Sequence, residues 1–413
     1  MTTRRGLVWI LGLGAFGLAF SITTTAAYLP PLLEKFTDSN TMIAAVLAAE
    51  GAFALTLPLV IGPWSDTFKT PMGRRRPFML AALWPIGFCL AIVAFMPNIW
   101  TMTLIVLAFF FAYYVYEPPY RGLYPDVLHE SMYGRSQGVQ HVLRGIALGI
   151  ALVGGGFLFK VWDPAPFLLA ALVTTAACGA VVALVQEADT EGSRVFRGVR
   201  SYVRTSWAVF SEVPEVRRFL FANAAWEGTF AAMRTFVVLY ITKGLGQPLS
   251  TSSAVLATVA VGYVIAALGS WKLGNRYGLA RVILVASIVY GAGLLAAGLA
   301  TEWHSWYYGF ILPVAVAGGT VMTLSWALLF KLMPAQHRGA ISGLATTTKG
   351  LGLLVGPLVA GVMIDVMKPY LSATDGYEML WPVCALPVLA AIPLVASLIP
   401  HEQGSGNAEP QPG

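Results

Sequence analysis

Charged residues are scarce in this chain: only 11% of its 413 residues are Asp, Glu, Lys or Arg, while 57% are hydrophobic. Soluble globular proteins carry about 25% charged residues, so the composition argues against a soluble protein and predicts one that lies in a membrane. Cysteine is also rare. Cys89, Cys178 and Cys384 lie far apart inside apolar segments, a spacing that shows neither a disulfide framework nor a metal site and indicates small buried side chains.

Long apolar segments take up most of the chain. A helix needs about 20 apolar residues to cross a bilayer. Twelve segments approach or exceed this length, at residues 7–33, 41–62, 78–96, 99–123, 137–160, 164–186, 216–241, 250–271, 281–300, 305–333, 340–364 and 379–399. The first is longer than the core of a signal peptide, about 7 to 15 residues, so we expect it to be retained as a transmembrane helix.

The basic residues predict the orientation in the membrane, because cytoplasmic loops carry an excess of Lys and Arg. Seventeen of them fall in loops on one side of the predicted spans and four on the other. We therefore expect both termini to be cytoplasmic and the protein to lie in a plasma membrane, such as the bacterial inner membrane. The basic residues are spread over short loops and not gathered on one face, which argues against a nucleic-acid partner.

The longest polar connection, residues 187–215, divides the predicted spans six and six. We expect an N-terminal six-helix bundle at 1–186, a cytoplasmic linker at 187–215, a C-terminal six-helix bundle at 216–400 and a disordered cytoplasmic tail at 401–413. The spacing of Trp207 and Phe210 fits an amphipathic helix on the membrane surface, and a solvated linker is the alternative.

The two halves repeat each other. Arg144 and Gly145 in the fifth predicted helix match Lys349 and Gly350 in the eleventh at a constant offset, and both helices are rich in glycine. Paired halves of this kind are typical of transporters that alternate access around a site at the membrane midplane. The glycines permit close helix approach, and simple packing explains most of them equally well.

The polar stretch at residues 62–78 carries Gly62-x-x-x-Asp66 followed by Gly73-Arg74-Arg75. This pattern resembles the signature loop of the major facilitator superfamily. The resemblance implies an all-α membrane protein with twelve transmembrane helices in two six-helix bundles. It also implies that Gly62, Asp66, Gly73, Arg74 and Arg75 form a gating loop, in which Asp66 contacts the start of helix 11 or an arginine in the outward-open state. The alternative is that the arginines only hold the loop in the cytoplasm.

Two details resemble a narrower branch, the glycoside-pentoside-hexuronide cation symporters and sucrose-proton symporters. One is the four-residue expansion between Asp66 and Gly73, and the other is the segment from Pro119 to Asp126. The chain departs from that branch at Thr67, where a basic residue is usual, and at Gly122, where alanine is usual. The resemblance implies a sugar or glycoside substrate.

Ionisable residues inside predicted spans are the first candidates for transport chemistry, because burying charge in a bilayer costs about 2.5 to 3.5 kcal/mol on insertion scales. Glu117 and Arg144 each lie about 12 Å from the cytoplasmic ends of their helices at 1.5 Å per residue. Arg121 is one turn from Glu117. We hypothesise that Glu117 accepts the proton, or helps to bind the cation, and that Arg144 or Arg121 donates hydrogen bonds to sugar hydroxyls. A static ion pair is the alternative.

Other candidates lie in helices 2 and 7. Glu50 stands alone near the middle of helix 2, where a coupling role and a protonated, hydrogen-bonded glutamate are both open. Asn223 and Glu227 share one face of helix 7, and Trp226 beside them offers a stacking surface for a sugar ring, although membrane aromatics mostly serve packing or the interface.

Two further residues complete the candidate set. Lys349 repeats the position of Arg144, and could serve an anionic substrate or pair with Glu227 or Asp365. His141 is one turn from Arg144, so it is a candidate proton relay or a structural residue.

The leading interpretation is a monomeric secondary transporter that carries out proton-coupled symport of a sugar or glycoside. We expect no cofactor and no metal; a proton or sodium gradient would drive it. One alternative is a proton-antiport exporter of a drug or metabolite. Exporters of the resembled superfamily often carry the motif Gly-x-x-x-Gly-Pro-x-x-Gly-Gly in helix 5. Here helix 5 has no proline, and Gly356-Pro357 stands in helix 11 instead. Another is an assembly or sensor protein. The sequence contains no nucleotide-binding loop or catalytic triad pattern, so no enzyme is expected.

Overall fold

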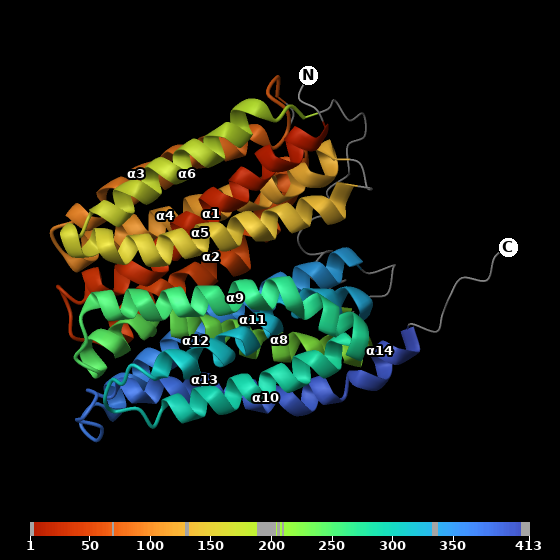
Figure 1. Cartoon of the computed structure of the whole chain (residues 1–413). Coiled ribbons are helices and arrows are strands. Elements are labelled where there is room, and N and C mark those ends of the chain that lie inside the picture. The colour runs from red at the N-terminus through yellow and green to blue at the C-terminus, as the bar shows by residue number, and fades with distance from the viewer. Residues whose placement is uncertain are drawn as a thin grey trace. The chain divides into compact units, whose positions relative to one another are not determined.

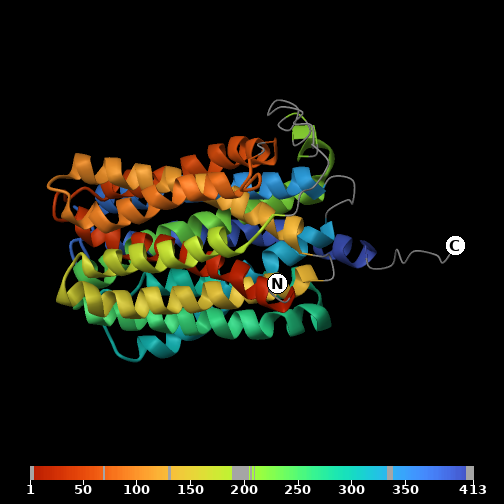
Figure 2. The same cartoon turned by 90° about the horizontal axis from the view of Figure 1, so that it is seen from above.

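The computed structural model describes residues 4–67, 70–128, 132–187, 204, 207–208, 210–332 and 338–405, and within these helices it leaves some side chains undescribed, including those of Asp66 and His141. The described part of the chain is helical, apart from turns and one short bridge between Thr70 and Gly73. Within each half of the chain the long helices run roughly along a common direction (Figure 1), which the perpendicular view also shows (Figure 2).

The first half contains α1 (Arg4–Leu33), α2 (Asn40–Thr67), α3 (Arg76–Ile92), α4 (Ile99–Val127), α5 (Tyr133–Val161) and α6 (Ala165–Leu184). The second half contains α8 (Pro214–Leu239), α9 (Leu249–Tyr277), α10 (Leu279–Ala297), α11 (Tyr307–Leu332), α12 (Arg338–Met367), α13 (Leu380–Ala396) and the short α14 (Ile399–Ser405). Each long helix coincides with one predicted span to within about six residues.

Eleven helices in the described part of the chain are long and apolar enough to cross a membrane. The long helix outside this set is α8, which spans 26 residues but carries Glu227 and Arg234 along its length. The predicted total of twelve spans therefore depends on α8.

The polar connections differ in part from expectation. In the linker, Arg204, Trp207, Ala208 and residues 210–212 are helical, and the rings of Trp207 and Phe210 stack with centroids 5.6 Å apart. This geometry favours the amphipathic helix over a solvated linker. At the C-terminus, α14 enters the range 401–413 predicted as a tail. The start of the predicted tail is therefore corrected to a helix, and its Glu402 accepts hydrogen bonds from the start of α10. Residues 406–413 lie outside the described part of the chain.

The chain divides into two compact units. The first contains residues 1–38 and 52–199, and the second contains residues 39–51 and 200–413. One boundary between the units falls between residues 199 and 200, within the segment predicted as a linker, and the start of α2 belongs to the second unit. This assignment has a physical cause: Gly51 lies so close to α12 that an added Cβ would come within 2.4 Å of the Leu354 nitrogen.

In the first unit, α1 packs against α5 and α6, and α3 packs against α4 and α6. Tyr28 crosses from α1 and donates a hydrogen bond to the carbonyl oxygen of Leu152 at 2.6 Å. Cys89 and Cys178 are free and buried, as is Cys384 in the other unit, which confirms the prediction of small buried side chains.

In the second unit, α8 packs against α12 and α13, α9 against α11, and α10 against α13. The contact between α8 and α12 is made by glycines. A Cβ added to Gly356 would lie 2.1 Å from the Gly228 carbonyl oxygen, and one added to Gly352 would lie 2.7 Å from the Gly228 nitrogen. Only glycine permits two helices to approach this closely.

The start of α2 is held on the second unit by Asp365 of α12. The Asp365 carboxylate accepts the backbone N–H groups of Asn40 at 3.0 Å and Thr41 at 2.8 Å, and the Thr41 hydroxyl at 2.7 Å. A carboxylate at the start of a helix satisfies N–H groups that have no partner within the helix. Asp365 therefore acts as a helix cap supplied by another helix, and it is not the ion-pair partner considered for Lys349.

Candidate functional site

Glu117 lies on α4 and pairs with Arg121 one turn later. Both Nε and a terminal nitrogen of Arg121 donate to one carboxylate oxygen of Glu117, at 3.0 and 2.6 Å. The Glu117 side chain is 12% exposed and that of Arg121 is 52% exposed. The i,i+4 spacing predicted this pair, and α4 remains helical through Pro118 and Pro119, from Ile99 to Val127.

Arg144 belongs to α5 in the same unit, but the structure records no ion pair between Arg144 and Glu117. Arg144 lies near Tyr120 and Tyr124 of α4. The hydroxyls of these two tyrosines are 2.7 Å apart, and the Tyr120 hydroxyl also lies 2.7 Å from the Leu11 carbonyl oxygen. The sequence thus located the charged residues of this cluster and missed its two tyrosines.

Glu50 is not isolated. Its side chain is 4% exposed, and it forms an ion pair with Arg234 of α8, whose side chain is 22% exposed. Both residues belong to the second unit, because the start of α2 packs there. A buried carboxylate needs such a partner, since burying an unpaired charge costs several kcal/mol. The expectation that Glu50 stands alone is therefore corrected; sequence reasoning missed it because the partners are 184 residues apart.

The helix 7 candidates lie on α8 and are buried. The Asn223 amide donates to the Thr348 hydroxyl at 3.1 Å and to the Ala345 carbonyl at 3.4 Å. Glu227 is 6% exposed and faces the glycine contact at Gly352. Trp226 is 1% exposed, and its Nε1 makes no hydrogen bond with any described residue. In this conformation its ring fills the core and presents no stacking face to a ligand.

The remaining candidates are less informative. Lys349 is half-buried on α12, and the structure records no ion pair from it to Glu227 or Asp365. His141 falls in α5, but its side chain lies outside the described part of the chain. Across the described ranges, no group of three His, Cys, Asp or Glu side chains could hold a metal ion.

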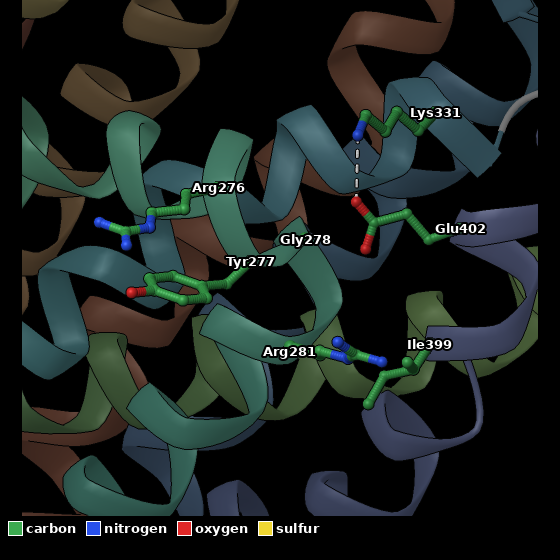
Figure 3. Close-up of a pocket in the computed structure, with 7 residues that line it drawn as sticks. All are labelled: Arg276, Tyr277, Gly278, Arg281, Lys331, Ile399 and Glu402. Atoms are coloured by element: carbon green, nitrogen blue, oxygen red, sulfur yellow. Dashed lines mark hydrogen bonds and ion pairs between the residues drawn. The ribbon is translucent and has the colours of Figure 1, made fainter. Parts of the chain in front are cut away.

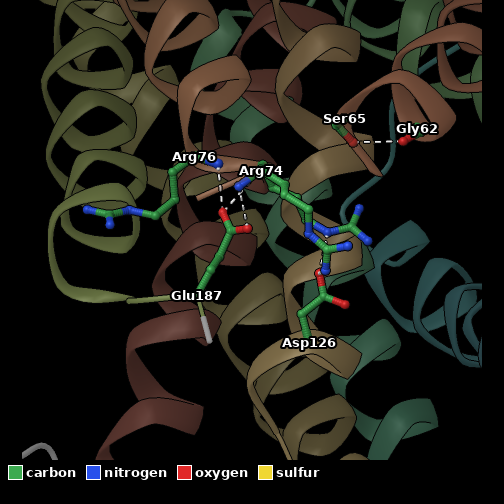
Figure 4. A network of polar contacts seen from close by, with 7 residues as sticks. Gly62, Ser65, Arg74, Arg76, Asp126 and Glu187 are labelled. Carbon is green, nitrogen blue, oxygen red and sulfur yellow. Dashed lines mark hydrogen bonds and ion pairs between the residues drawn. The ribbon is translucent and has the colours of Figure 1, made fainter. Parts of the chain in front are cut away.

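Three residues of the predicted gating loop, Gly73, Arg74 and Arg75, lie directly before α3. Gly73 has a φ of +101°, a conformation that favours glycine, and a Cβ there would also lie 2.6 Å from the Glu187 carboxyl carbon. Glu187 follows α6, and its carboxylate accepts the backbone N–H groups of Arg74 at 2.7 Å and of Arg75 and Arg76 at 2.9 Å each (Figure 4). It is thus a helix cap for α3, which sequence reasoning did not identify.

The arginine side chains of the loop contact α4. Arg75 donates from Nε to Asp126 at 2.6 Å, and Arg74 lies 3.6 Å from the same carboxylate (Figure 4). The guanidinium of Arg75 occupies the space where a Cβ at Gly122 would stand, with one nitrogen 1.9 Å from that position. The glycine that departs from the resembled pattern therefore makes room for Arg75. Gly62 lies in α2, and the Asp66 side chain is outside the described part.

The second unit contains the same kind of helix cap, in which a glutamate accepts the first N–H groups of a helix that follows a glycine. Gly278 has a φ of +93° and precedes α10, whose first N–H groups, at Leu279 and Ala280, donate to Glu402 at 2.8 Å each. Lys331 of α11 also donates to this carboxylate at 3.1 Å. Burial alone would raise the pKa of Glu402, but the two backbone hydrogen bonds and Lys331 outweigh it and lower the pKa below its ordinary value. In both units, a glutamate after the sixth long helix caps the third.

Comparisons with known proteins show similarity to drug-resistance and transport proteins. The chain is 26% identical over 156 residues to multidrug resistance protein 3 of Bacillus subtilis, a match that covers 32% of this chain and only 30% of that protein. It is 24% identical over 405 residues to the class G tetracycline resistance protein of Vibrio anguillarum, covering 94% and 95% of the two chains. The glucose transporter GlcP of Staphylococcus epidermidis is 23% identical over 129 residues, covering 31% and 29%.

Solved structures show the same fold. The nucleoside transporter NupG matches with a TM-score of 0.72 and 14% identity over 98% of this chain and 100% of that one. A bacterial homolog of the human lysosomal transporter Spinster matches with a TM-score of 0.75 and 13% identity over 100% of both chains. The sequence profile of the Major Facilitator Superfamily matches residues 11–357 and again 221–409. This integral membrane protein therefore belongs to the Major Facilitator Superfamily of transporters.

Proposed function

We propose that this transporter works by alternating access and couples the movement of a sugar or glycoside to that of a proton in the same direction. The observation that carries the proposal is the pair of Glu117 and Arg121, in which the carboxylate is nearly buried and the arginine is half exposed. A carboxylate held by a guanidinium stays ionised at neutral pH. A substrate hydroxyl that competes for Arg121 would weaken this ion pair and so favour proton uptake by Glu117.

The surroundings of the pair support a polyhydroxyl ligand. The linked hydroxyls of Tyr120 and Tyr124 and the guanidinium of Arg144 lie on neighbouring turns of α4 and on α5. Hydroxyl groups both donate and accept, while guanidinium groups donate in a planar fork. Tyr120 and Tyr124 are buried in this conformation, so we assign the contacts with sugar hydroxyls first to Arg121 and Arg144.

A second site for coupling is Glu50 with Arg234. Its two side chains are more enclosed than the first pair, at 4% and 22% exposure against 12% and 52%. A substrate in water reaches the less enclosed pair more readily, so we assign proton coupling first to Glu117. Glu50 would then take part in the conformational change, because its pair joins α2 to α8.

We further propose that α8 crosses the membrane as the twelfth span, that both termini are cytoplasmic, and that the protein acts as a monomer in a bacterial inner membrane without a cofactor. The orientation of the termini is supported by the asymmetry of Lys and Arg between the two sides of the spans. Arg234 on α8 gains a partner in Glu50, which lowers the cost of placing its charge within the bilayer.

Export is the second candidate function. It is favoured by the tetracycline resistance protein, the relative above that aligns with nearly the whole chain. In that case the substrate would be a drug or metabolite that leaves in exchange for a proton. The two candidates differ in the direction of substrate movement relative to the proton.

The test is transport in proteoliposomes with a panel of labelled mono- and disaccharides, with and without a pH gradient. If the protein is a symporter, a pH gradient should drive accumulation of the sugar in the same direction as the proton. Glu117→Gln should lose this accumulation but should still exchange sugar when no gradient is imposed. A matched control is Asp163→Asn, which removes a carboxylate that pairs with Lys35 and is 39% exposed. Undiminished proton-driven accumulation by Glu117→Gln would refute the proposed role of Glu117 in proton coupling. If no sugar moves and a drug moves against the proton, the chain is an exporter.

A further inference from the structure

Helix ends of the second unit line an open pocket of about 320 Å³. Its polar lining is supplied by Arg276, Arg281, Lys331 and Glu402, and its apolar lining includes Tyr277 and Ile399 (Figure 3). These residues come from the end of α9, the start of α10, the end of α11 and the short α14. None of them belongs to the ion pairs assigned to transport above.

The pocket carries an excess of positive charge. Its single carboxylate, Glu402, is already engaged by the N–H groups of Leu279 and Ala280 and by Lys331. Arg276 lies over the ring of Tyr277 at 5.2 Å from its centroid. Within the described ranges, no carboxylate forms an ion pair with Arg276 or Arg281. Figure 3 shows the Arg281 side chain extending toward Ile399, apart from the Lys331 and Glu402 pair.

The pocket also lies at a defined depth. Candidate membrane spans end at Tyr277, Leu329 and Ala396, and another begins at Leu279. Lys331 and Ile399 follow two of these ends within two and three residues. The pocket is therefore at the level where hydrocarbon gives way to lipid headgroups. Tyr277 at this boundary has the amphipathic character that aromatic residues show at membrane interfaces.

We propose that this pocket binds the phosphate group of an anionic lipid headgroup. Guanidinium groups bind phosphate oxygens through paired, charge-assisted hydrogen bonds. The volume suits a small ligand, and Ile399 offers an apolar surface beside the charged groups. The shared chemistry is that of a phosphate ester, so free phosphate in solution is the other source to be tested. The inference does not depend on the sugar substrate or on the direction of transport.

The experiment uses the full-length protein, purified in detergent and titrated with phosphatidylglycerol or phosphatidylcholine, with lipid binding measured by native mass spectrometry. Each arginine near a lipid headgroup contributes about fivefold in affinity. We expect Arg281→Gln to weaken phosphatidylglycerol binding about fivefold and to leave phosphatidylcholine binding unchanged. Arg276→Gln should weaken it less, because the Arg276 guanidinium points away from Arg281 and Ile399 (Figure 3). The matched control is Lys272→Gln, which removes one exposed charge from the same helix outside the pocket.

Three outcomes would overturn the proposal. Equal weakening by all three variants would show diffuse attraction to positive charge. Equal binding of the two lipids by the unchanged protein would show that the headgroup is not recognised. Inorganic phosphate that raises the melting temperature of the lipid-free protein, but not of Arg281→Gln, together with no preference for phosphatidylglycerol, would assign the pocket to a soluble phosphate. Transport activity plays no part in these readouts, so the result is separate from the proposed function.

Discussion

The glycine contact between α8 and α12 makes a sharp prediction about Gly356. An alanine there would place its Cβ 2.1 Å from the Gly228 carbonyl oxygen, where ordinary contact begins at 3.4 Å, so the two atoms must separate by 1.3 Å. Both of the closest atoms are backbone, and no side chain can rotate away. The helices must therefore move apart, and overpacking of this kind costs about 1 to 3 kcal/mol.

The matched control is Gly145→Ala on α5, the helix that repeats α12 in the first unit. A Cβ at Gly145 would meet no atom within 4 Å. Alanine there removes the conformational cost of glycine in a helix, about 0.5 to 1 kcal/mol. Gly356→Ala should thus lower the apparent melting temperature in detergent, and Gly145→Ala should leave it unchanged or raise it.

The comparison also tests whether the helices are as close as described. If Gly356→Ala has the same melting temperature as the unchanged protein, the 2.1 Å approach is not present in solution. If Gly145→Ala is destabilised as strongly as Gly356→Ala, glycine serves both helices in some way other than close approach, and the reasoning from contact distances is wrong. Size-exclusion profiles after heating separate unfolding from aggregation in both variants.

Three further predictions follow from the ion pairs and caps. Glu50→Gln or Arg234→Gln alone should destabilise the protein by about 3 to 5 kcal/mol, since each removes one partner of a buried ion pair. The double variant should recover much of the loss, and additive losses in thermal melting would contradict the pairing. Glu402 has a lowered pKa, so its contribution to stability is present above its ordinary pKa of 4.5 and is lost as the pH falls through the lower folded value. The stability difference between the unchanged protein and Glu402→Gln should therefore shrink below about pH 4.5. A difference that does not change with pH would refute the role of Glu402 as a helix cap. Gly73→Ala should destabilise more than Gly246→Ala, because both have positive φ but only Gly73 faces a carboxylate at 2.6 Å; equal melting temperatures would show that φ alone matters.

Much of the fold could be predicted because its signal is local. A span of about 20 apolar residues has few options in a bilayer other than a helix, and the predicted starts at residues 41, 99 and 250 lie within one residue of α2, α4 and α9. The repeated halves were visible in the match of Arg144 and Lys349. The start of the tail was missed because α14 is too short and polar to give an apolar signal.

The same distinction between local and long-range signals explains which site contacts could be predicted. The pair of Glu117 and Arg121 follows from helical spacing, so it was predicted. The partner of Glu50 and the glutamates that cap α3 and α10 were missed, because each interaction joins residues more than 100 positions apart. The placement of Trp226 in the core was also invisible, since a tryptophan next to polar residues has the same local pattern whether it is buried or open to a ligand.

By itself, the sequence determined the membrane class, the helices, their division into two halves and the resemblance to the superfamily, because hydropathy, helical period and signature motifs act over short distances. The tertiary structure decided which charges are paired: Glu50 with Arg234, Arg75 with Asp126, and each capping glutamate with its helix. The physical reason is that a buried charge must be neutralised by whichever opposite charge lies beside it in space, and no local pattern records that neighbour.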